Sequence, residues 1–429
     1  MAEPNGAEAR SVAFVIARDL HPTVDGRRAR LKHVVAAACE LGLRVRVVML
    51  VRRVASADRD FCASLGVTVT QVAPQSGLRL LIGLAKCLLS GCPLQYAIFS
   101  QRRIASSIRA ACRGCDVVYA DMLRAGDGLR QPHSRFRLVL DIDEFLSDRY
   151  RQFDHGHHWR KIEALVPLPR WAVRAVARLL ALPVNRWEAT TMWRRERRCR
   201  RHADVVTMVS PADARRLASL PPRRGAPVVP LLLCGSFAHT VTRTQRPDPT
   251  LVGMIGNLTL ESNRQGLQRF LLINADWLAA DRVRIEIVGA HDDEAAADAD
   301  AWRRRGVDLH LLGFVPDLRQ ATRRWLCGLA PIYNATGLNV KNLDYLALGL
   351  PIIGTRFAFR GLAAAAYLLA IDEGGFPGQL RLLRSLDDQA YDRLCHLAQA
   401  AYRQHHAPGL MPANLRLVLQ AAGSPSAGC

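Results

Sequence analysis

Residues 337–355 read GLNVKNLDYLALGLPIIGT, and this stretch holds the pieces of one α/β unit. It begins with a glycine-containing loop, and the apolar spacing of the next residues predicts a helix over residues 341–348. A Gly-Leu-Pro sequence follows, and the apolar run at residues 351–354 predicts a short buried strand. A loop that opens a helix in this way offers unpaired backbone N–H groups to an anion, and the helix dipole strengthens the attraction.

The same alternation of strands and helices extends in both directions from this stretch. In the second half of the chain we expect buried strands at residues 251–255, 285–288, 309–312 and 328–331, with a helix near residues 263–278. In the first half the expected strands lie at residues 11–17, 45–51, 67–72, 116–120, 137–140 and 204–209, with helices over residues 27–41 and from residue 210 onward. Strands that alternate with helices indicate parallel sheets covered on both faces, so the expected fold class is α/β.

A segment rich in Pro, Arg and Thr at residues 221–250 separates the two series and is interpreted as a linker. We therefore expect a first Rossmann-like domain over residues 1–245 and a second over residues 246–405. The tail at residues 406–429 is expected to cross back to the first domain. Two α/β domains of like construction usually bind a ligand in a cleft between them, at the carboxyl ends of their strands.

Composition narrows the class of protein. A chain of 429 residues is long enough for two or three domains, and its 49% of hydrophobic residues excludes a largely disordered chain. We expect no signal peptide in the first ten residues, MAEPNGAEAR, because they lack an apolar core. No apolar run approaches the roughly 18–20 residues of a membrane-spanning helix. The 11 cysteines are scattered singly apart from the pair Cys112 and Cys115, which predicts reduced thiols in the cytosol.

Positive charge is concentrated in the first half. The chain has 59 Lys and Arg against 38 Asp and Glu, a net charge of +21. Residues 1–245 hold 40 of these basic residues and 20 of the acidic ones, whereas residues 246–429 hold 19 and 18. The first half should therefore face an anionic membrane surface, a phosphorylated acceptor or nucleic acid. It contains no nucleic-acid recognition motif, so we expect no nucleic acid among the partners.

Residues 337–355, with Arg360, Gly361 and Leu362 after them, resemble the nucleotide-sugar signature of GT-B glycosyltransferases of family 4, the glycosyl transferases group 1 domain. In that family the pattern is roughly G-x-x-x-K-x-L-E-x-[LM]-A-x-G-x-P-V-[IV]-x-T, often followed by G-L. Further likeness lies at residues 253–270, 285–289 and 311–318. Residues 116–124 and 141–150 resemble segments of exopolysaccharide-type members, and the whole resemblance spans about residues 11–405.

The resemblance implies a GT-B fold, in which two Rossmann-like parallel-sheet domains face a cleft. It implies a glycosyltransferase that moves a hexose from a nucleotide sugar to a lipid-linked or polysaccharide acceptor in bacterial glycan biosynthesis, with retention of configuration. The nucleotide sugar is a co-substrate, and no metal or other cofactor is required. A protein of this kind is expected in the cytoplasm, peripherally associated with the inner face of the plasma membrane.

Two residues of the expected helix at 341–348 have a physical rationale as ligands. Lys341 lies in the first turn, where an ammonium group can neutralise phosphate oxygens. Asp344 lies on the same face of the helix, where a carboxylate can accept hydrogen bonds from ribose hydroxyls. The resemblance extends the donor-binding set to Gly256, Asn257, Arg264, Thr336, Gly337, Leu338, Asn339 and Asp344. It assigns catalysis to Lys341, Asp121 and Arg124, and acceptor or phosphate contacts to Gly26, Arg27 and Arg28.

The chain also departs from the family pattern. Many members hold the donor with two Glu eight positions apart, and here Thr336 and Asp344 occupy those positions. Asn257 stands where an Arg is frequent, Arg264 takes the place of a Lys, and Asp121 stands where a catalytic-region His is common. These departures leave open a second function: a catalytically impaired GT-B scaffold that binds a membrane or an anionic polymer through its basic half.

Two segments combine apolar and basic residues in a way typical of helices that lie on a membrane surface, residues 78–89 and residues 169–187. In the second, Arg170, Arg174 and Arg178 recur every four residues and so share one helical stripe. Pro183 is expected to end that helix. The alternative is a helix that packs on the domain core with its Arg side chains in water.

Overall fold

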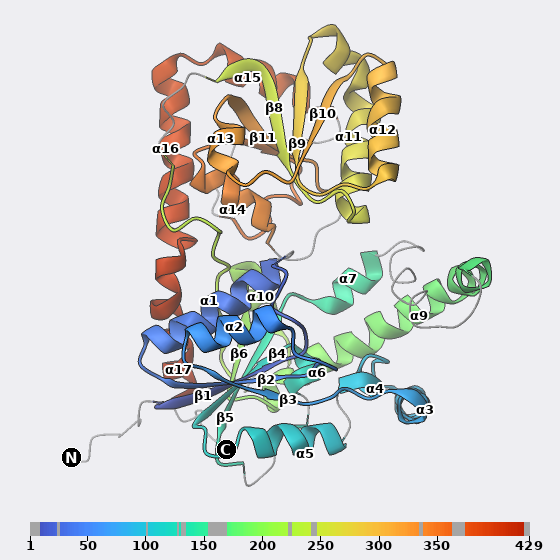
Figure 1. Cartoon of the computed structure of the whole chain (residues 1–429), viewed down its shortest axis with the longest axis vertical. Helices are drawn as coiled ribbons and strands as arrows, with labels where there is room; N and C mark the ends of the chain where they lie inside the picture. The colour runs from blue at the N-terminus through green and yellow to red at the C-terminus, as the bar shows by residue number, and fades with distance from the viewer. Residues whose placement is uncertain are drawn as a thin grey trace. The chain divides into compact units, whose positions relative to one another are not determined.

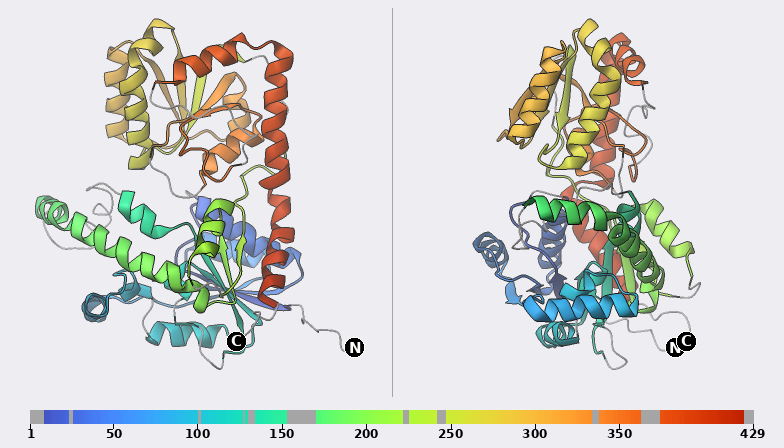
Figure 2. Two further views of the ribbon diagram at one scale, coloured as in Figure 1. Left: turned by 180° about the vertical axis from the view of Figure 1, so that it is seen from behind. Right: turned by 90° about the vertical axis from the view of Figure 1, so that its right-hand side faces the viewer.

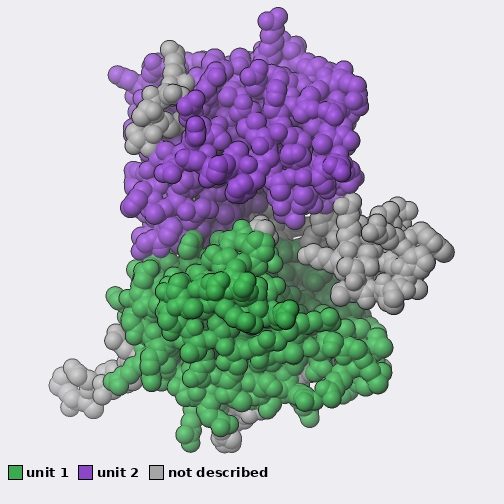
Figure 3. Space-filling model, viewed as in Figure 1, with its two compact units in different colours: residues 1–232, 411–429 green, residues 233–410 purple. Residues whose placement is uncertain are grey.

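The computed structural model describes residues 9–23, 26–99, 102–126, 128–129, 134–152, 170–221, 225–241, 247–333, 338–362 and 374–423, and gives residues 170–181 as backbone only. The chain divides into two compact units (Figure 3). The first unit comprises residues 1–232 and 411–429, and the second comprises residues 233–410.

The division falls earlier than the expected boundary at residue 245, because the segment that follows residue 232 is hydrogen-bonded within the second unit. The backbone N–H of Gly235 donates to the carbonyl oxygen of His406 over 3.0 Å. The N–H of Phe237 donates to the hydroxyl of Tyr402 over 3.2 Å. The segment expected as a linker also contains a strand, β7 (Val228–Pro230), at the edge of the first sheet. Pro230 suits an edge strand because proline cannot donate to a neighbouring strand.

A seven-stranded sheet forms the centre of the first unit, in the order β3-β2-β1-β4-β5-β6-β7 (Figure 1). Every pair of neighbouring strands is parallel. The strands before β7 are β1 (Ser11–Ile16), β2 (Arg44–Met49), β3 (Thr68–Gln71), β4 (Val117–Asp121), β5 (Arg137–Asp143) and β6 (Val205–Met208). β1, β4 and β6 are buried along their whole length, as expected of strands covered on both faces.

Helices cover both faces of this sheet (Figure 2). They are α1 (Gly26–Glu40), α2 (Ser56–Ser64), α3 (Gly77–Ser90), α4 (Tyr96–Phe99), α5 (Arg102–Ala111), α6 (Leu123–Gly126), α7 (Leu146–Gln152), α9 (Arg170–Arg198), α10 (Pro211–Ser219) and α17 (Met411–Gly423), with a 3-10 turn, η1 (Cys199–Arg201), after α9. α1 and α17 pack against each other and against the sheet. Residues of α3, α5 and α9 join one hydrophobic core with the strands.

The expectation that Pro183 ends a helix is wrong, because α9 continues through it to Arg198. The part of α9 beyond the proline is held by the segment that follows α3. The indole N–H of Trp187 donates to the carbonyl oxygen of Cys92 over 3.1 Å, and a Glu188 carboxylate oxygen accepts the N–H of Leu94 over 2.5 Å. These tertiary contacts stabilise helical backbone that the proline alone would interrupt.

The second unit is built on a five-stranded parallel sheet in the order β10-β9-β8-β11-β12. Its strands are β8 (Asp248–Ile255), β9 (Arg284–Val288), β10 (Asp308–Gly313), β11 (Trp325–Ala330) and β12 (Ile352–Gly354). Its helices are α11 (Glu261–Ala280), α12 (Asp293–Arg304), α13 (Leu318–Thr322), α14 (Val340–Ala347), α15 (Phe376–Ser385) and α16 (Asp388–His405), with a 3-10 turn, η3 (Pro408–Leu410), at the end. α11, α12 and α15 pack on one face of the sheet and α14 on the other, and α16 contributes residues to both hydrophobic cores. The predicted α/β class is confirmed for both units.

Candidate functional site

A close approach of two backbone segments shapes the carboxyl ends of β8 and β9 in the second unit. The N–H of Gly256 donates to the carbonyl oxygen of Val288 over 2.8 Å. Gly289 follows with a φ of +142°, and a Cβ atom at this position would lie 2.3 Å from the carbonyl oxygen of Gly256. Only glycine fits such a conformation and such a contact. The predicted donor residue Gly256 therefore lies in a turn that is tightly fixed.

Asn263, in the first turn of α11, links this turn to α14. Its side-chain Nδ2 donates to the carbonyl oxygen of Asn257 over 2.8 Å, and its Oδ1 accepts from the Nζ of Lys341 over 3.0 Å. Asn257, Asn263 and Lys341 thus form a continuous chain of hydrogen bonds, which we call the Lys341 chain. Sequence reasoning singled out Asn257 and Lys341 but not Asn263, which lies within a quoted motif without a charge to draw attention to it.

Lys341 is partly buried, and burial lowers its pKa to about 8. The charged form of an amine loses hydration in such a place, so it is favoured again when an anion binds beside it. Within the described residues its side chain donates to an amide oxygen and not to a carboxylate. The ammonium group of Lys341 is therefore poised to respond to an anionic ligand.

The N-terminus of α14 supplies further polar groups. Asn339 occupies the N-cap position without a side-chain cap, and its Nδ2 is buried with no partner among the described residues. Leu338 packs against the hydrophobic core of this face of the sheet. Thr336 and Gly337 lie outside the described residues, so their predicted roles in donor binding stay predictions.

Asp344 lies three residues after Lys341 on α14 and is buried. Burial raises the pKa of its carboxyl group to about 6, against hydrogen bonds from the side chain and backbone of Ser236 that lower it. Its Oδ1 atom has no partner in the described part of the chain. A buried carboxylate oxygen of this kind has one hydrogen-bonding position to offer a ligand.

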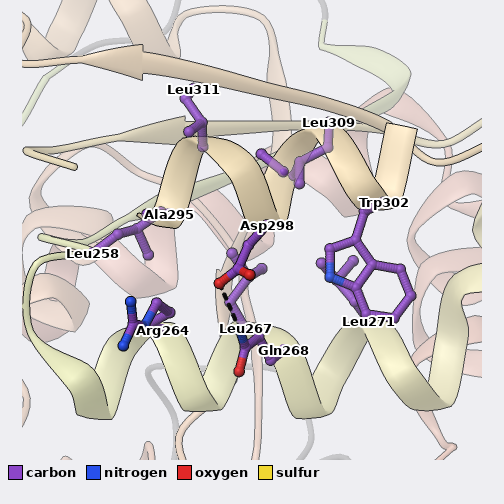
Figure 4. A pocket seen from close by; sticks show the side chains of 11 residues that line it. Leu258, Arg264, Leu267, Gln268, Leu271, Ala295, Asp298, Trp302, Leu309 and Leu311 are labelled. Carbon is purple, nitrogen blue, oxygen red and sulfur yellow. Dashed lines mark hydrogen bonds between the residues drawn. The ribbon is translucent and has the colours of Figure 1, made fainter. Parts of the chain in front are cut away.

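Arg264 is directed toward α12. Its guanidinium pairs with the carboxylates of Glu261 and Glu294, each over 2.6 Å. Figure 4 shows it at one end of a pocket between α11 and α12, where Gln268 donates to Asp298 over 2.6 Å. The pocket is lined mainly by apolar side chains, among them Trp302. The charge of Arg264 is already balanced there, and its predicted role in donor binding stays a prediction.

In the first unit the carboxyl ends of β4 and β5 meet the beginning of α1 in a buried cluster of charged residues. Arg27, in the first turn of α1 next to Gly26, donates through Nε to Oδ1 of Asp121 over 2.7 Å. A terminal nitrogen of the same guanidinium lies 2.7 Å from Oδ2 of Asp143. Arg27 and Asp121, both predicted from the sequence, are therefore direct partners, and Asp143 completes the set.

A second arginine of α1 extends this buried cluster. Arg30 has no exposed surface, and its guanidinium lies 2.6 Å from Oδ2 of Asp141. Tyr119 and Thr207 also donate to Asp141, over 2.7 and 3.0 Å. Burial alone would raise the pKa of Asp141, but the two arginines outweigh it and hold that pKa below its ordinary value. Sequence reasoning assigned no role to Arg30 or to Asp141. The one signal for Asp141 is an acidic residue at the end of an otherwise apolar strand.

Asp143 of this cluster and Met122 beside it have backbone conformations that are unfavourable for residues with a side chain. Met122, directly after β4, has a φ of +71°, and Asp143, at the end of β5, has a φ of +68°. Non-glycine residues with such angles cost roughly 1–3 kcal/mol each and gather at functional sites. The carboxyl edge of the first sheet therefore combines buried charge with backbone strain.

The remaining predicted residues of the first unit, Arg124 and Arg28, lie in different surroundings: Arg124 is close enough to interact with the charges of Asp121 and Arg27, and Arg28 is not part of that cluster. Arg124, on α6, is half-buried, and loss of hydration together with the charge of Arg18 lowers its pKa to about 10. Its guanidinium lies 5.1 Å from the ring centre of Phe99. Arg28 instead donates through Nε to the carbonyl oxygen of Asp19 over 3.0 Å, so it faces the segment after β1 and lies outside the charged cluster.

The described residues show neither a metal cluster nor a membrane-spanning helix. Among them no group of three His, Cys, Asp or Glu side chains is placed to hold a metal ion. Cys112 and Cys115 are buried free thiols, and burial raises the pKa of Cys112 to about 12. Within the described part of the chain, none of the helices is both long and apolar enough to cross a bilayer.

Comparisons with known proteins find one matching family model and several similar solved structures. Residues 249–373 match the model of the family described as glycosyl transferases group 1, and this range contains the Lys341 chain and Asp344. Comparison with curated proteins finds no match.

Solved structures match nearly the whole chain. HepE of Anabaena in complex with UDP is 14% identical with a TM-score of 0.63, over 96% of this chain and 100% of HepE. The pneumococcal O-GlcNAc transferase GtfA, in complex with UDP and GlcNAc, is 10% identical with a TM-score of 0.62, over 96% and 99%. The UDP-forming α,α-trehalose-phosphate synthase of Burkholderia vietnamiensis is 12% identical with a TM-score of 0.56, over 96% and 100%. Residues 249–373 are therefore similar to a glycosyl transferases group 1 domain, and the chain has the fold of these solved GT-B glycosyltransferase structures.

Proposed function

We propose that this chain is a family 4 glycosyltransferase of the exopolysaccharide type. It transfers a hexose from a nucleotide sugar to a lipid-linked or polysaccharide acceptor in bacterial glycan biosynthesis, with retention of configuration. The Lys341 chain carries the proposal, because it places a cation and polar groups at the carboxyl ends of parallel strands inside the matched domain. HepE has been solved with UDP-glucose and GtfA with UDP, so UDP is the first nucleotide to test.

The donor is proposed to bind to the second unit. Its diphosphate lies against Lys341 and the backbone N–H groups at residues 337–339, where the positive end of the α14 dipole adds to the attraction. The turn at Gly256 and Asn257 lets the backbone approach the phosphates closely. The open Oδ1 of Asp344 accepts a ribose hydroxyl. Thr336 and Arg264 complete the proposed donor set.

Catalysis in this proposal consists mainly of leaving-group stabilisation. As the bond between sugar and diphosphate breaks, negative charge grows on the departing phosphate oxygens. Lys341 and the N–H groups proposed to line the diphosphate would face that charge without rearrangement, so they would stabilise the transition state more than the ground state. In this proposal the ammonium group of Lys341 and the N–H groups at the start of α14 stabilise the leaving group, so the reaction needs no metal ion. The nucleotide sugar is the only co-substrate.

The first unit is proposed to bind the acceptor. Asp121 and Arg124 at the carboxyl end of β4 orient the acceptor hydroxyl, and Gly26 and Arg27 at the start of α1 contact its phosphate, with Arg28 nearby on the same helix. The buried pairing of Arg27 with Asp121 and Asp143 fixes these groups in one arrangement. Fixed positions matter because rate depends steeply on the geometry of the attacking hydroxyl.

The uneven distribution of charge between the two units supports binding to an anionic surface. The first unit, residues 1–232 and 411–429, holds 40 Lys and Arg against 20 Asp and Glu, and the second unit holds 19 against 18. We propose that the basic unit faces the inner leaflet of the bacterial plasma membrane, where a lipid-linked acceptor would be found, and that the protein is cytoplasmic and peripheral. No nucleic acid is among the proposed partners.

The experiment that tests the function compares Lys341→Ala with the native chain in UDP binding by calorimetry and in UDP release from a panel of UDP-sugars. Loss of a group that stabilises developing charge should lower turnover by about 100-fold or more. Arg304→Ala is the matched control, because Arg304 is an exposed basic residue in the last turn of α12 of the same unit. UDP binding without any UDP release from the native chain would instead favour the impaired scaffold, and equal turnover in Lys341→Ala would contradict the assigned site.

A further inference from the structure

Helix α3 exposes an apolar face to its surroundings. Leu89 is 90% exposed, Leu78 is 73% exposed and Leu81 is 63% exposed, and Ile82 and Leu88 are exposed as well. At ~100° per residue these five side chains fall within about one third of the helix circumference. The face is therefore continuous along the length of α3.

The opposite face of the same helix is already occupied. Leu80, Leu84 and Cys87 pack into the core of the first unit. Gly83 lies so close to α4 that an added Cβ atom would be 3.2 Å from the Cβ of Ala97. A surface helix normally presents polar residues on the side away from its core, so apolar residues on both sides indicate a second surface that is covered by a partner.

The charge around α3 indicates the chemistry of that partner. Between Asp60 and Asp116 the sequence contains no acidic residue and six basic ones. These basic residues are Arg79, Lys86, Arg102, Arg103, Arg109 and Arg113. Arg79 and Lys86 are exposed on α3 itself, beside its apolar face. An apolar face bordered only by positive charge matches an anionic lipid surface, which offers acyl chains and phosphates together.

A part of α9 is joined to the segment after α3 and has a similar combination of side chains. Through the hydrogen bonds of Trp187 and Glu188 described above, α9 is fixed to the segment that directly follows α3. On this part of α9, Leu182 and Arg186 are exposed, which repeats the combination of an aliphatic and a basic side chain. Two joined helices of the first unit therefore expose aliphatic and basic side chains.

We propose that α3 is the element by which the first unit docks on an anionic lipid surface. The exposed aliphatic side chains enter the region between headgroups and acyl chains, and Arg79 and Lys86 contact headgroup phosphates. The inference deepens the proposed function, since it rests on a lipid-linked acceptor and names the helix that brings the enzyme to the membrane.

The test measures co-sedimentation of the full chain with vesicles of phosphatidylcholine alone and of phosphatidylcholine mixed with phosphatidylglycerol. The native chain should bind the mixed vesicles and release them at high salt. Leu81→Ser combined with Leu89→Ser should lower the partition coefficient by about tenfold or more. The matched control is Leu272→Ser with Leu417→Ser, which changes two similarly exposed leucines on α11 and α17 and should bind as the native chain does.

The measurement separates the alternatives. Circular dichroism and the melting temperature should be unchanged in the α3 variant, because both leucines are exposed. Vesicle binding by the α3 variant equal to that of the native chain would overturn the proposal. So would a lipid-free dimer that the same variant dissolves, because the partner would then be a second copy of the chain. UDP binding, measured separately by calorimetry, tests the proposed function and should be unchanged in the α3 variant.

Discussion

The Nζ of Lys341 donates a hydrogen bond to the Oδ1 of Asn263 over 3.0 Å, and this bond joins the first turn of α14 to the first turn of α11. An amide is a neutral partner for an ammonium group. The lysine is therefore held in position without losing its charge to a carboxylate, so that charge remains for an anionic ligand. The ammonium group of Lys341 could therefore pair with a bound diphosphate without first breaking an ion pair within the described part of the chain.

Replacement of Asn263 by Asp tests this arrangement. The new carboxylate would pair with Lys341 and repel the phosphates of UDP, so the affinity for UDP should fall by about tenfold or more. Calorimetric titration of UDP measures the change. Gln265→Glu is the control, because it adds the same charge to an exposed position of α11, and it should change the affinity little. Equal losses in the two variants would mean that only the net charge of α11 matters.

A pH dependence of UDP binding follows from the pKa of Lys341, which burial lowers to about 8. Below pH 8 the free protein carries the ammonium form, and above it the neutral amine prevails. UDP affinity should therefore fall as the pH rises from 7 to 9.5, approaching tenfold per pH unit at the upper end. Lys341→Arg keeps its charge over this range and should show a flat profile. Parallel profiles for the two proteins would contradict the assignment.

Asp344 should make stability depend on pH in the opposite sense from a salt-bridged carboxylate. Burial raises its pKa to about 6, above the value of about 3.9 in an unfolded chain, so the folded state binds the proton more tightly. Its contribution to stability is present at low pH and is lost as the pH rises through 6. Between pH 5 and pH 7.5 this group should lower the free energy of unfolding by about 1–2 kcal/mol.

Asp344→Asn isolates that contribution, because it removes the titration and keeps the shape of the side chain. Urea unfolding at both pH values should show that the native chain loses about 1–2 kcal/mol more than the variant does. The same pH dependence in both proteins would show that Asp344 does not titrate as its burial implies.

Local elements of this fold could be predicted from sequence, and long-range ones could not. The helix expected at residues 341–348 and the strand at 351–354 are present as α14 and β12, because apolar periodicity and glycine positions are local signals. Asn263 and Lys341 are 78 residues apart, and no spacing rule predicts their hydrogen bond. The sequence located the two ends of the Lys341 chain but not the residue that joins them.

The buried cluster of the first unit shows the same limit. Arg30 and Asp141 are 111 residues apart, and their pairing depends on how α1 packs over the carboxyl end of β5. A basic residue on a helix is usually solvated, so Arg30 gave no signal of complete burial. The strand expected at residues 137–140 continues to Asp143, because its last acidic side chains are compensated by arginines that only the fold brings near.

Removal of one partner from this buried pair should destabilise the first unit strongly. Arg30→Met leaves Asp141 buried with only neutral donors and the weaker influence of Arg27, and the loss should be about 3–5 kcal/mol by urea unfolding. The control is Arg284→Met, since Arg284 pairs with Asp308 at an exposed site where a loss of about 0–1 kcal/mol is expected. Adding Asp141→Asn to Arg30→Met should restore part of the stability, because no unpaired charge would remain. Equal losses for Arg30→Met and Arg284→Met would contradict this reading of the cluster.

Gly289→Ala tests whether the tight turn at Gly256 belongs to the UDP site. The added Cβ would lie 2.3 Å from the carbonyl oxygen of Gly256 and 3.1 Å from the N–H nitrogen of Asn257, so the turn must move. UDP affinity should fall by about tenfold or more, since the backbone groups beside the Lys341 chain would shift. Gly374→Ala is the control, because Gly374 also has a positive φ, +95°, but no atom of the described residues lies within 4 Å of the added Cβ. That variant should lose about 1 kcal/mol of stability from backbone strain and keep its UDP affinity. Native-like UDP binding by Gly289→Ala would place the nucleotide away from the Gly256 turn and would remove Gly256 and Asn257 from the donor site.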